Sequence, residues 1–237
     1  MKALILAVQF MTRLPLPAIA ADEDDFARAI RWFPIAGIAV GLCVAAAAWA
    51  GLRHDPWAGA LAALLAWVAV TGALHLDGLG DIADAAGAAH SDPARLSAVL
   101  ADPHIGSFGV TAIGLQLIAK LVLLRLAMDA VPLAALVAVP LAARIGPLVW
   151  TLTLPPLHRG MGTSFGAGAN WPACAAWFLV LGASAWWTGP ALLLAPAAIA
   201  LWGLWLHRRI GGISGDGHGA GIELAETATL AALVFLQ

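Results

Sequence analysis

Long apolar stretches alternate with short polar ones along almost the whole chain. Seven of them approach the roughly 20 mostly apolar residues that a membrane-spanning helix needs. They cover residues 34–52, 57–76, 109–128, 133–154, 173–188, 190–206 and 220–237. The fifth and sixth are short and meet at Gly189-Pro190, which predicts a tight helical hairpin. The pattern predicts an all-α fold, a polytopic membrane bundle of about seven transmembrane helices.

Composition supports this class. Of the 237 residues, 62% are hydrophobic and 11% are charged, whereas about 25% are charged in an ordinary soluble domain. A net charge of −2 without any Lys/Arg run argues against a nucleic-acid partner. Residues 1–17 carry an apolar run but no small-residue cleavage site, so we predict an interfacial helix ending at Pro15 and no signal peptide. We expect residues 1–237 to form one membrane-embedded domain whose surroundings are the lipid bilayer.

The distribution of positive residues predicts the orientation, because Lys and Arg stay on the cytoplasmic side. With the N-terminus in the cytoplasm, only Arg53 falls on the opposite side. The cytoplasmic segments then carry Lys2, Arg13, Arg28, Arg31, Arg95, Arg159, Arg208 and Arg209. The long polar segments 1–33, 77–108, 155–172 and 207–219 therefore face the cytoplasm. Elaborate loops on one face and minimal turns on the other are typical of an enzyme working at one membrane surface.

The first candidate site is the stretch from His75 to Asp84, HLDGLGDIAD. If it continues as a helix, Asp77, Asp81 and Asp84 stand at i, i+4 and i+7 and share one face. Three neighbouring carboxylates repel one another unless a cation lies among them, and hard oxygen ligands suit Mg²⁺ or Mn²⁺. The small residues between the acids leave room for a diphosphate. The alternative is a solvated polar helix end.

The second candidate site lies near the C-terminus. Six glycines occupy positions 211 to 221, and seven residues separate Asp216 from Glu223, as they separate Asp77 from Asp84. We expect a glycine loop running into a helix N-terminus, an arrangement that favours phosphate, metal or both. Gly215 and His218 belong to this loop as candidate substrate-binding residues. The alternative is a flexible connection between spans, although Glu223 entering the membrane is costly without a partner.

Further candidates are scattered between these motifs. Asp102 either ligates a metal or substrate or N-caps the turn that begins at Pro103, and His104 follows it. Lys120 and Arg144 fall inside predicted spans, where cations are functional candidates that pair with acids such as Asp77 or Glu223 or neutralise phosphate charge. Other candidates, each with a bland alternative as an interfacial residue, are Arg159 as a phosphate clamp and His75, His90, His104 and His218 as a general base, with His75 preferred because it lies one helical turn from the acids.

These motifs occur together, in order, in one known family. The segments FMTRLPLP at 10–17, FPIAG at 33–37, HLDGLGDIAD at 75–84, DPHIG at 102–106 and GDGHGAGIE at 215–223 resemble the cobalamin synthase family, the adenosylcobinamide-GDP ribazoletransferases. Lys120 and Arg144 are similar to basic positions of that family. Two departures are visible. The family usually has an acidic residue after the Arg at position 159, where this chain has Gly160, and a basic residue is frequent where this chain has Ala101.

The resemblance implies the last step of cobalamin nucleotide-loop assembly. A ribose hydroxyl of α-ribazole, or of its 5′-phosphate, attacks the phosphorus on the corrinoid's aminopropanol arm in adenosylcobinamide-GDP, and GMP leaves with Mg²⁺ as helper. It implies metal binding by Asp77, Asp81 and Asp84 with Asp216 and Glu223, and a bacterial-type cytoplasmic (inner) membrane with the active site facing the cytoplasm. Other corrinoid-assembly enzymes, or a second copy of the chain, are the expected protein partners.

Two other functions fit parts of the pattern. A CDP-alcohol phosphotransferase making a phospholipid also has an Asp-Gly acidic motif at a helix end, but this chain lacks the Ala-Arg pair that continues the motif there. A cation transporter would use the acids as an ion path, but it predicts symmetric halves, and the chain has no convincing internal repeat.

Overall fold

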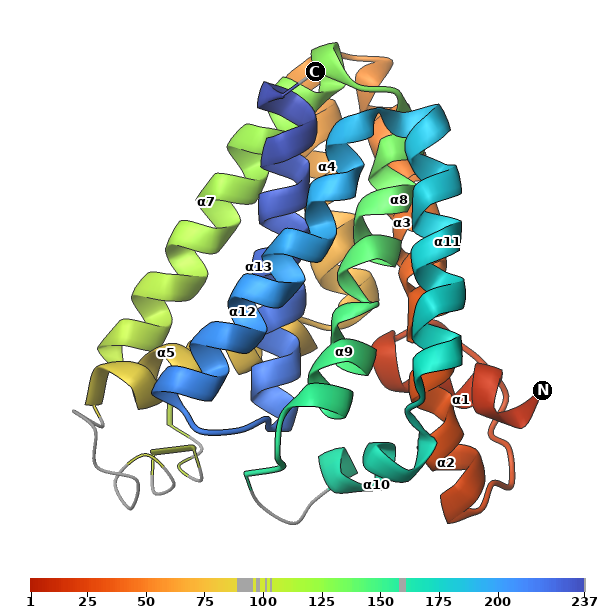
Figure 1. Cartoon of the computed structure of the whole chain (residues 1–237). Helices are drawn as coiled ribbons and strands as arrows, with labels where there is room; N and C mark the ends of the chain where they lie inside the picture. The colour runs from red at the N-terminus through yellow and green to blue at the C-terminus, as the bar shows by residue number, and fades with distance from the viewer. Residues whose placement is uncertain (89–95, 97–98, 101, 103, 158–160, 237) are drawn as a thin grey trace.

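The fold of the chain is helical throughout the residues that our computed structural model describes, which are 1–88, 96, 99–100, 102, 104–157 and 161–236. Its long helices lie side by side in a bundle (Figure 1). They are α3 (Phe33–Leu52), α4 (Pro56–Thr71), α7 (Ser107–Ala130), α8 (Leu133–Ala143), α9 (Gly146–Thr153), α11 (Trp171–Thr188), α12 (Ala195–Arg209) and α13 (Gly215–Phe235). The shorter elements are α1 (Lys2–Met11), α2 (Glu23–Ala29), η1 (Ile30–Trp32), α5 (Leu74–Ala88), α10 (Met161–Gly168) and η2 (Pro190–Leu194).

The two ends of the bundle differ. Helices α1, α2, α5 and α10 gather at one end, the lower end in Figure 1, which we call the α5 end. At the opposite end the chain turns within a few residues, at 53–55 between α3 and α4 and at 131–132 between α7 and α8. This asymmetry agrees with the predicted placement of the polar segments on one face.

Four helical stretches are long and apolar enough to cross a membrane, judged by length and composition. They are Glu23–Leu52, Ser107–Ala130, Leu133–Thr153 and Pro190–Arg209. A fifth results if α4 and the bent helix after it count as one span. A helical element lies within each of the seven predicted spans. An all-helical fold with four to five apolar spanning helices is therefore established, and two further crossings, α11 and α13, belong to the proposal below.

The second predicted span does not run unbroken over 57–76. Helix α4 ends at Thr71, and α5 leaves it at an angle of 83°. Gly72 and Ala73 both have positive φ, 61° and 59°. Gly72 is the left-handed C-cap of α4, a position where glycine carries no Cβ penalty. The acidic stretch therefore lies on a helix of its own, which crosses the α5 end of the bundle.

The predicted glycine loop over 211–221 is also shorter than expected. Helix α13 already begins at Gly215, and Ser214 is its N-cap, with its hydroxyl accepting a hydrogen bond from Gly217 N at 3.0 Å. The later glycines lie within the helix, where they cost helix propensity. They are tolerated because they permit close packing. A methyl group at Gly221 would collide with the indole rings of Trp150 and Trp202.

Small residues also set the distance between the central helices α3 and α8. A methyl group at Gly41 would lie 2.5 Å from Val137 Cα, and one at Gly37 would collide with the Pro140 carbonyl. Contacts of this kind are how helices associate within a bilayer, where burial of apolar surface between helices brings little gain.

Four phenylalanines join the short helices of the α5 end to the bundle. Phe10 of α1, Phe26 of α2, Phe33 of α3 and Phe165 of α10 form one cluster, with ring centroids 4.9–5.9 Å apart in five pairs. Both edge-to-face and stacked pairs occur in it, and each stabilises by about 0.5–1.5 kcal/mol beyond burial. The N-terminal helix predicted at the interface is therefore packed against the bundle.

Candidate functional site

The two acidic motifs meet where α5 crosses the first turns of α13. A methyl group at Gly78 would lie 2.9 Å from Asp216 Cα, and one at Gly219 would lie 3.3 Å from His75 Cα. These glycine contacts bring the two helix backbones together although 138 residues separate Gly78 from Asp216 in the sequence. The first turns of α13 thereby add a carboxylate to the acidic face of α5.

Asp81 is the centre of this acidic face, which comprises Asp77, Asp81 and Asp216. Partial burial raises the pKa of Asp81 to about 6, and the negative charges of Asp216, Asp77 and Asp84 raise it further in that order. Crowded carboxylates of this kind are stabilised by a cation. The face therefore attracts positive charge at the end of the bundle that also carries the polar segments.

Asp84 makes a different set of contacts, because both of its carboxylate oxygens accept backbone hydrogen bonds. Oδ2 accepts from Gly106 N at 2.7 Å and Oδ1 from Gly109 N at 3.0 Å. Gly106 is the N-cap position of α7, where no side chain of α7 itself caps the helix. Asp84 satisfies amides that would otherwise lack partners at the start of this helix. It anchors α7 to α5, and its predicted role as a metal ligand stays a prediction.

Lys120 lies in a buried ion cluster deeper in the bundle. Its Nζ contacts Glu223 Oε2 at 2.7 Å and Glu226 Oε2 at 2.5 Å, and Arg144 Nη1 donates to Glu226 Oε1 at 2.8 Å. Gln116, one turn before Lys120, donates to Glu223 Oε2 at 2.9 Å. The four charged side chains are at most 4% exposed. Two acids and two bases compensate one another here, as buried charges require.

The cluster links α7 and α8 to α13, and it decides where Glu223 lies. The predicted pairing of Lys120 with Glu223 is confirmed. Glu223 follows Asp216 by seven residues of helix, which is about 10 Å along the axis. In this structure Glu223 is held by Lys120 and Gln116, so its predicted part in metal binding stays a prediction.

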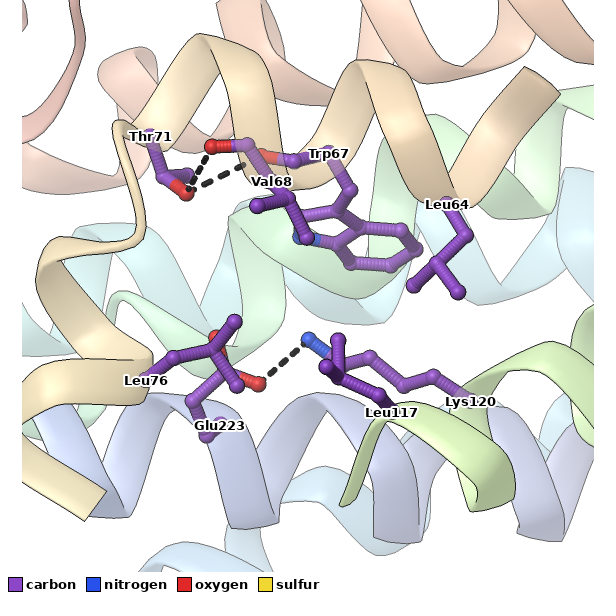
Figure 2. A pocket seen from close by; sticks show the side chains of 8 residues that line it. All are labelled: Leu64, Trp67, Val68, Thr71, Leu76, Leu117, Lys120 and Glu223. Atoms are coloured by element: carbon purple, nitrogen blue, oxygen red, sulfur yellow. Dashed lines mark hydrogen bonds and ion pairs between the residues drawn. The ribbon is translucent and has the colours of Figure 1, made fainter. Parts of the chain in front are cut away.

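A narrow pocket opens beside this ion cluster between α4, α5, α7 and α13 (Figure 2). The Lys120 ammonium lies over the Trp67 ring, 4.5 Å from its centroid, in a cation–π contact. Figure 2 shows the Lys120 amine pointing toward Glu223 across the pocket, below the indole of Trp67. Its lining residues are Leu64, Trp67, Val68, Thr71, Leu76, Leu117, Lys120 and Glu223.

Two of the predicted histidines are buried at the junction of α5 and α13. His75 is 2% exposed, and its Nε2 lies 3.4 Å from Met11 Sδ. His218 is 8% exposed, and its Nε2 lies 3.3 Å from Thr151 Oγ1. Nδ1 of each ring has no hydrogen-bond partner within the described part of the chain. Both rings therefore keep one nitrogen open beside the acidic face.

Asp102 and His104 are exposed and contact each other. Asp102 Oδ1 accepts from the backbone N–H of His104 at 3.0 Å and lies 2.7 Å from its Nδ1. These hydrogen bonds lower the pKa of Asp102. The α7 N-cap is Gly106, and Asp84 supplies the capping oxygens there. Arg159 and His90 lie outside the described residues.

The acidic face suits a divalent cation through its chemistry. Among the described residues no group of three His, Cys, Asp or Glu side chains is already arranged to hold a metal ion. Mg²⁺ is commonly bound by one or two carboxylates together with substrate phosphates and water. The acidic face supplies carboxylates of this kind on Asp77, Asp81 and Asp216, with charge that a cation would offset.

Known proteins share this chain over nearly its full length. Residues 3–234 match the family model described as cobalamin-5-phosphate synthase. The chain belongs to the cobalamin-5-phosphate synthase family. It is similar to proteins named adenosylcobinamide-GDP ribazoletransferase from Novosphingobium aromaticivorans (58% identity, 97% of this chain and 95% of the relative), Laribacter hongkongensis (53%, 97% and 95%) and Thiobacillus denitrificans (50%, 97% and 94%). No solved structure matches it.

Membership of the cobalamin-5-phosphate synthase family makes the chain an enzyme, a transferase of cobalamin biosynthesis, as its motifs predict. Sequence reasoning did not assign Glu226 or Gln116 a role in the site. Signals for both were present, because Gln116 and Lys120 are spaced i, i+4 and Glu223 and Glu226 are spaced i, i+3, so each pair shares a helix face. Only the packed helices show that these two faces meet.

Proposed function

We propose that the protein catalyses the Mg²⁺-dependent transfer of adenosylcobinamide phosphate from adenosylcobinamide-GDP to α-ribazole, or to α-ribazole 5′-phosphate, with release of GMP. The observation that carries the proposal is the meeting of Asp77 and Asp81 with Asp216 at one end of a bundle of this family. Relatives that share at least half of their residues with this chain bear the name of this reaction.

The reaction needs charge neutralisation and a proton acceptor. The ribazole hydroxyl oxygen forms a bond to the phosphorus that carries the corrinoid arm, the bond from that phosphorus to GMP breaks, and GMP takes the bonding electron pair. Mg²⁺, or Mn²⁺, on the acidic face would neutralise the diphosphate and stabilise the leaving phosphate. Asp77, Asp81 and Asp216 would hold it. Their carboxylates would also set the position of the diphosphate relative to α5.

The hydroxyl proton needs a base close to the attacking oxygen. We assign it to His75, whose Nδ1 keeps a lone acceptor or donor position beside the acidic face. Gly215 and His218, at the start of α13, and Asp102 with His104, before α7, are proposed substrate contacts around it. Lys120 and Arg144 act in this proposal through Glu223 and Glu226, by fixing the position of α13.

We further propose seven crossings with the N-terminus and the acidic face on the cytoplasmic side of a bacterial-type inner membrane. Exposed tryptophans support this placement, because Trp favours the membrane interface. Trp32 and Trp49 flank α3, 17 residues apart, and Trp171 and Trp187 lie 16 apart on α11. At 1.5 Å per residue both spacings are about 25 Å, close to the roughly 30 Å hydrocarbon core. Association with other corrinoid-assembly enzymes, or self-association, completes the proposal.

The test uses the purified protein in nanodiscs with adenosylcobinamide-GDP, each acceptor, and either Mg²⁺ or EDTA, with GMP and the cobamide followed by chromatography. We expect both products to appear together and only with the metal. Asp81→Asn should reduce turnover by at least 100-fold, whereas Asp24→Asn, an exposed acid of α2 at the same end, should match the wild type. Turnover in EDTA, or normal turnover by Asp81→Asn, would overturn the metal assignment. A wild type that releases no GMP would overturn the reaction, and CDP-alcohols would be tested next.

A further inference from the structure

The end of α1 is attached to the bend between α4 and α5, about 60 residues away in the sequence. Arg13 N donates to Val70 O at 2.7 Å, and Met11 Sδ lies 3.4 Å from His75 Nε2. The Arg13 side chain covers Gly72, where a methyl group would lie 2.5 Å from Arg13 Nε and 2.6 Å from Cγ. The N-terminal segment therefore forms part of the wall from which the acidic helix begins.

The backbone around Arg13 is held in place. Thr12 is 5% exposed, and its hydroxyl donates to Val8 O at 2.7 Å and accepts from Leu14 N at 3.3 Å. These bonds end α1 in a fixed turn. Gly72 has a φ of 61°, a conformation that side chains rarely adopt, so the position facing Arg13 favours glycine on two grounds. The base of the Arg13 side chain is consequently confined to one direction.

The guanidinium itself is exposed, and no described residue forms a hydrogen bond or ion pair with it. Other arginines of the chain have such partners. Arg31 donates to Gly168 O, Arg125 to Asp129 and Arg144 to Glu226. A fixed cation with open donors, placed at the residue five before Asp77, lies next to a site that must bind a highly anionic substrate. Arginine is the residue that matches phosphate oxygens with two parallel hydrogen bonds.

We infer that Arg13 is a substrate-binding residue whose guanidinium contacts a phosphate of the substrate held at the acidic face. The inference rests on the proposed function, because it takes the substrate to be a phosphate ester. The carboxylates and their cation bind one side of the phosphate group, and Arg13 supplies positive charge from the α1 side. The phosphate belongs either to the diphosphate of adenosylcobinamide-GDP or to the 5′-phosphate of the acceptor, and the two sources share the same chemistry.

The test compares Arg13→Ala and Arg13→Lys with Arg28→Ala, an exposed arginine of α2 at the same end. Losing a charged hydrogen bond to phosphate corresponds to about 10- to 100-fold in binding. We expect Arg13→Ala to lower kcat/KM by this factor, chiefly through KM, and Arg13→Lys to recover part of it. A loss with both acceptors assigns the phosphate to adenosylcobinamide-GDP, and a loss only with α-ribazole 5′-phosphate assigns it to the acceptor.

A second measurement does not depend on turnover. Inorganic diphosphate with Mg²⁺ should raise the apparent Tm of the wild type and of Arg28→Ala, and should raise that of Arg13→Ala much less. If the wild type forms product and Arg13→Ala equals Arg28→Ala in kcat/KM and in this Tm shift, the inference is wrong while the proposed function stands. If the wild type forms no product, the proposed function fails, and the diphosphate shift alone decides whether Arg13 binds phosphate. Equal losses in Arg13→Ala and Arg13→Lys, with a lower Tm and unchanged KM, would show a structural role instead.

Discussion

Gly78 of α5 packs directly against the backbone of Asp216 in α13, so closely that a methyl group at Gly78 would lie 2.9 Å from Asp216 Cα. Backbone atoms cannot move aside as the end of a flexible side chain can. The distance between the two acidic motifs is thus set by the absence of a side chain at one position. Any residue larger than glycine there must push α13 away from α5.

Gly78→Ala should therefore impair the site more than the fold. We expect turnover to fall at least tenfold and the Mg²⁺ concentration for half-maximal activity to rise, since the carboxylate of Asp216 is displaced from Asp81. Gly114→Ala in α7 is the control, because a methyl group there meets nothing within 4 Å. It should keep full activity and gain up to about 1 kcal/mol from helix propensity. Equal activity of the two variants would show that close packing at Gly78 is not required.

Asp84→Ala separates an anchoring role from a metal-binding role. Removing the carboxylate leaves Gly106 N and Gly109 N without their acceptor, which should cost about 1–3 kcal/mol. We expect a lower apparent Tm at every Mg²⁺ concentration and an unchanged Mg²⁺ dependence of the remaining activity. Asp77→Asn, whose side chain is exposed, should leave Tm nearly unaltered and weaken the Mg²⁺ dependence. The reverse pattern would identify Asp84 as a ligand.

Glu226→Gln should destabilise the protein strongly, because Arg144 would keep its charge at 0% exposure without a counter-charge. Breaking a buried pair by removing one partner costs about 3–5 kcal/mol. Unfolding in mixed micelles would measure this loss. The control is Asp129→Asn, which breaks the exposed i, i+4 pair with Arg125 and should cost less than about 0.5 kcal/mol. Similar losses in both variants would contradict the compensating role of the buried cluster.

The raised pKa of Asp81 predicts how stability depends on pH without metal. The folded value of about 6 lies above the ordinary 3.8, so the folded state binds the proton more tightly than the unfolded state. Ionisation of Asp81 therefore costs stability above pH 6, and this cost is relieved as the pH falls from 7.5 toward 5. In EDTA, the wild type should lose stability relative to Asp81→Asn as the pH rises over this range. Saturating Mg²⁺ should abolish that difference at pH 7.5, and a difference that persists would show that the metal does not reach Asp81.

Sequence alone determined the class of the molecule and the identity of its polar groups. Helices over the apolar stretches follow from the need to satisfy every backbone group inside a bilayer. The pairing of Lys120 with Glu223 followed from the cost of leaving an intramembrane charge alone. The motifs around Asp77 and Asp216 also indicated the family, because their residue types and spacing are local properties of the chain.

Tertiary structure decided which of these groups meet. Local pattern did not indicate that the chain bends by 83° after Thr71, because this bend depends on left-handed backbone at Gly72 and Ala73 and on the docking of α1 against it. Nor did it separate Asp84, bound by the amides of α7, from Asp81 in the acidic face, because helical spacing places both on one face of α5. Spacing along a helix determines direction only, whereas the function of a carboxylate depends on which backbone amides, cations or other carboxylates the packed helices bring to it.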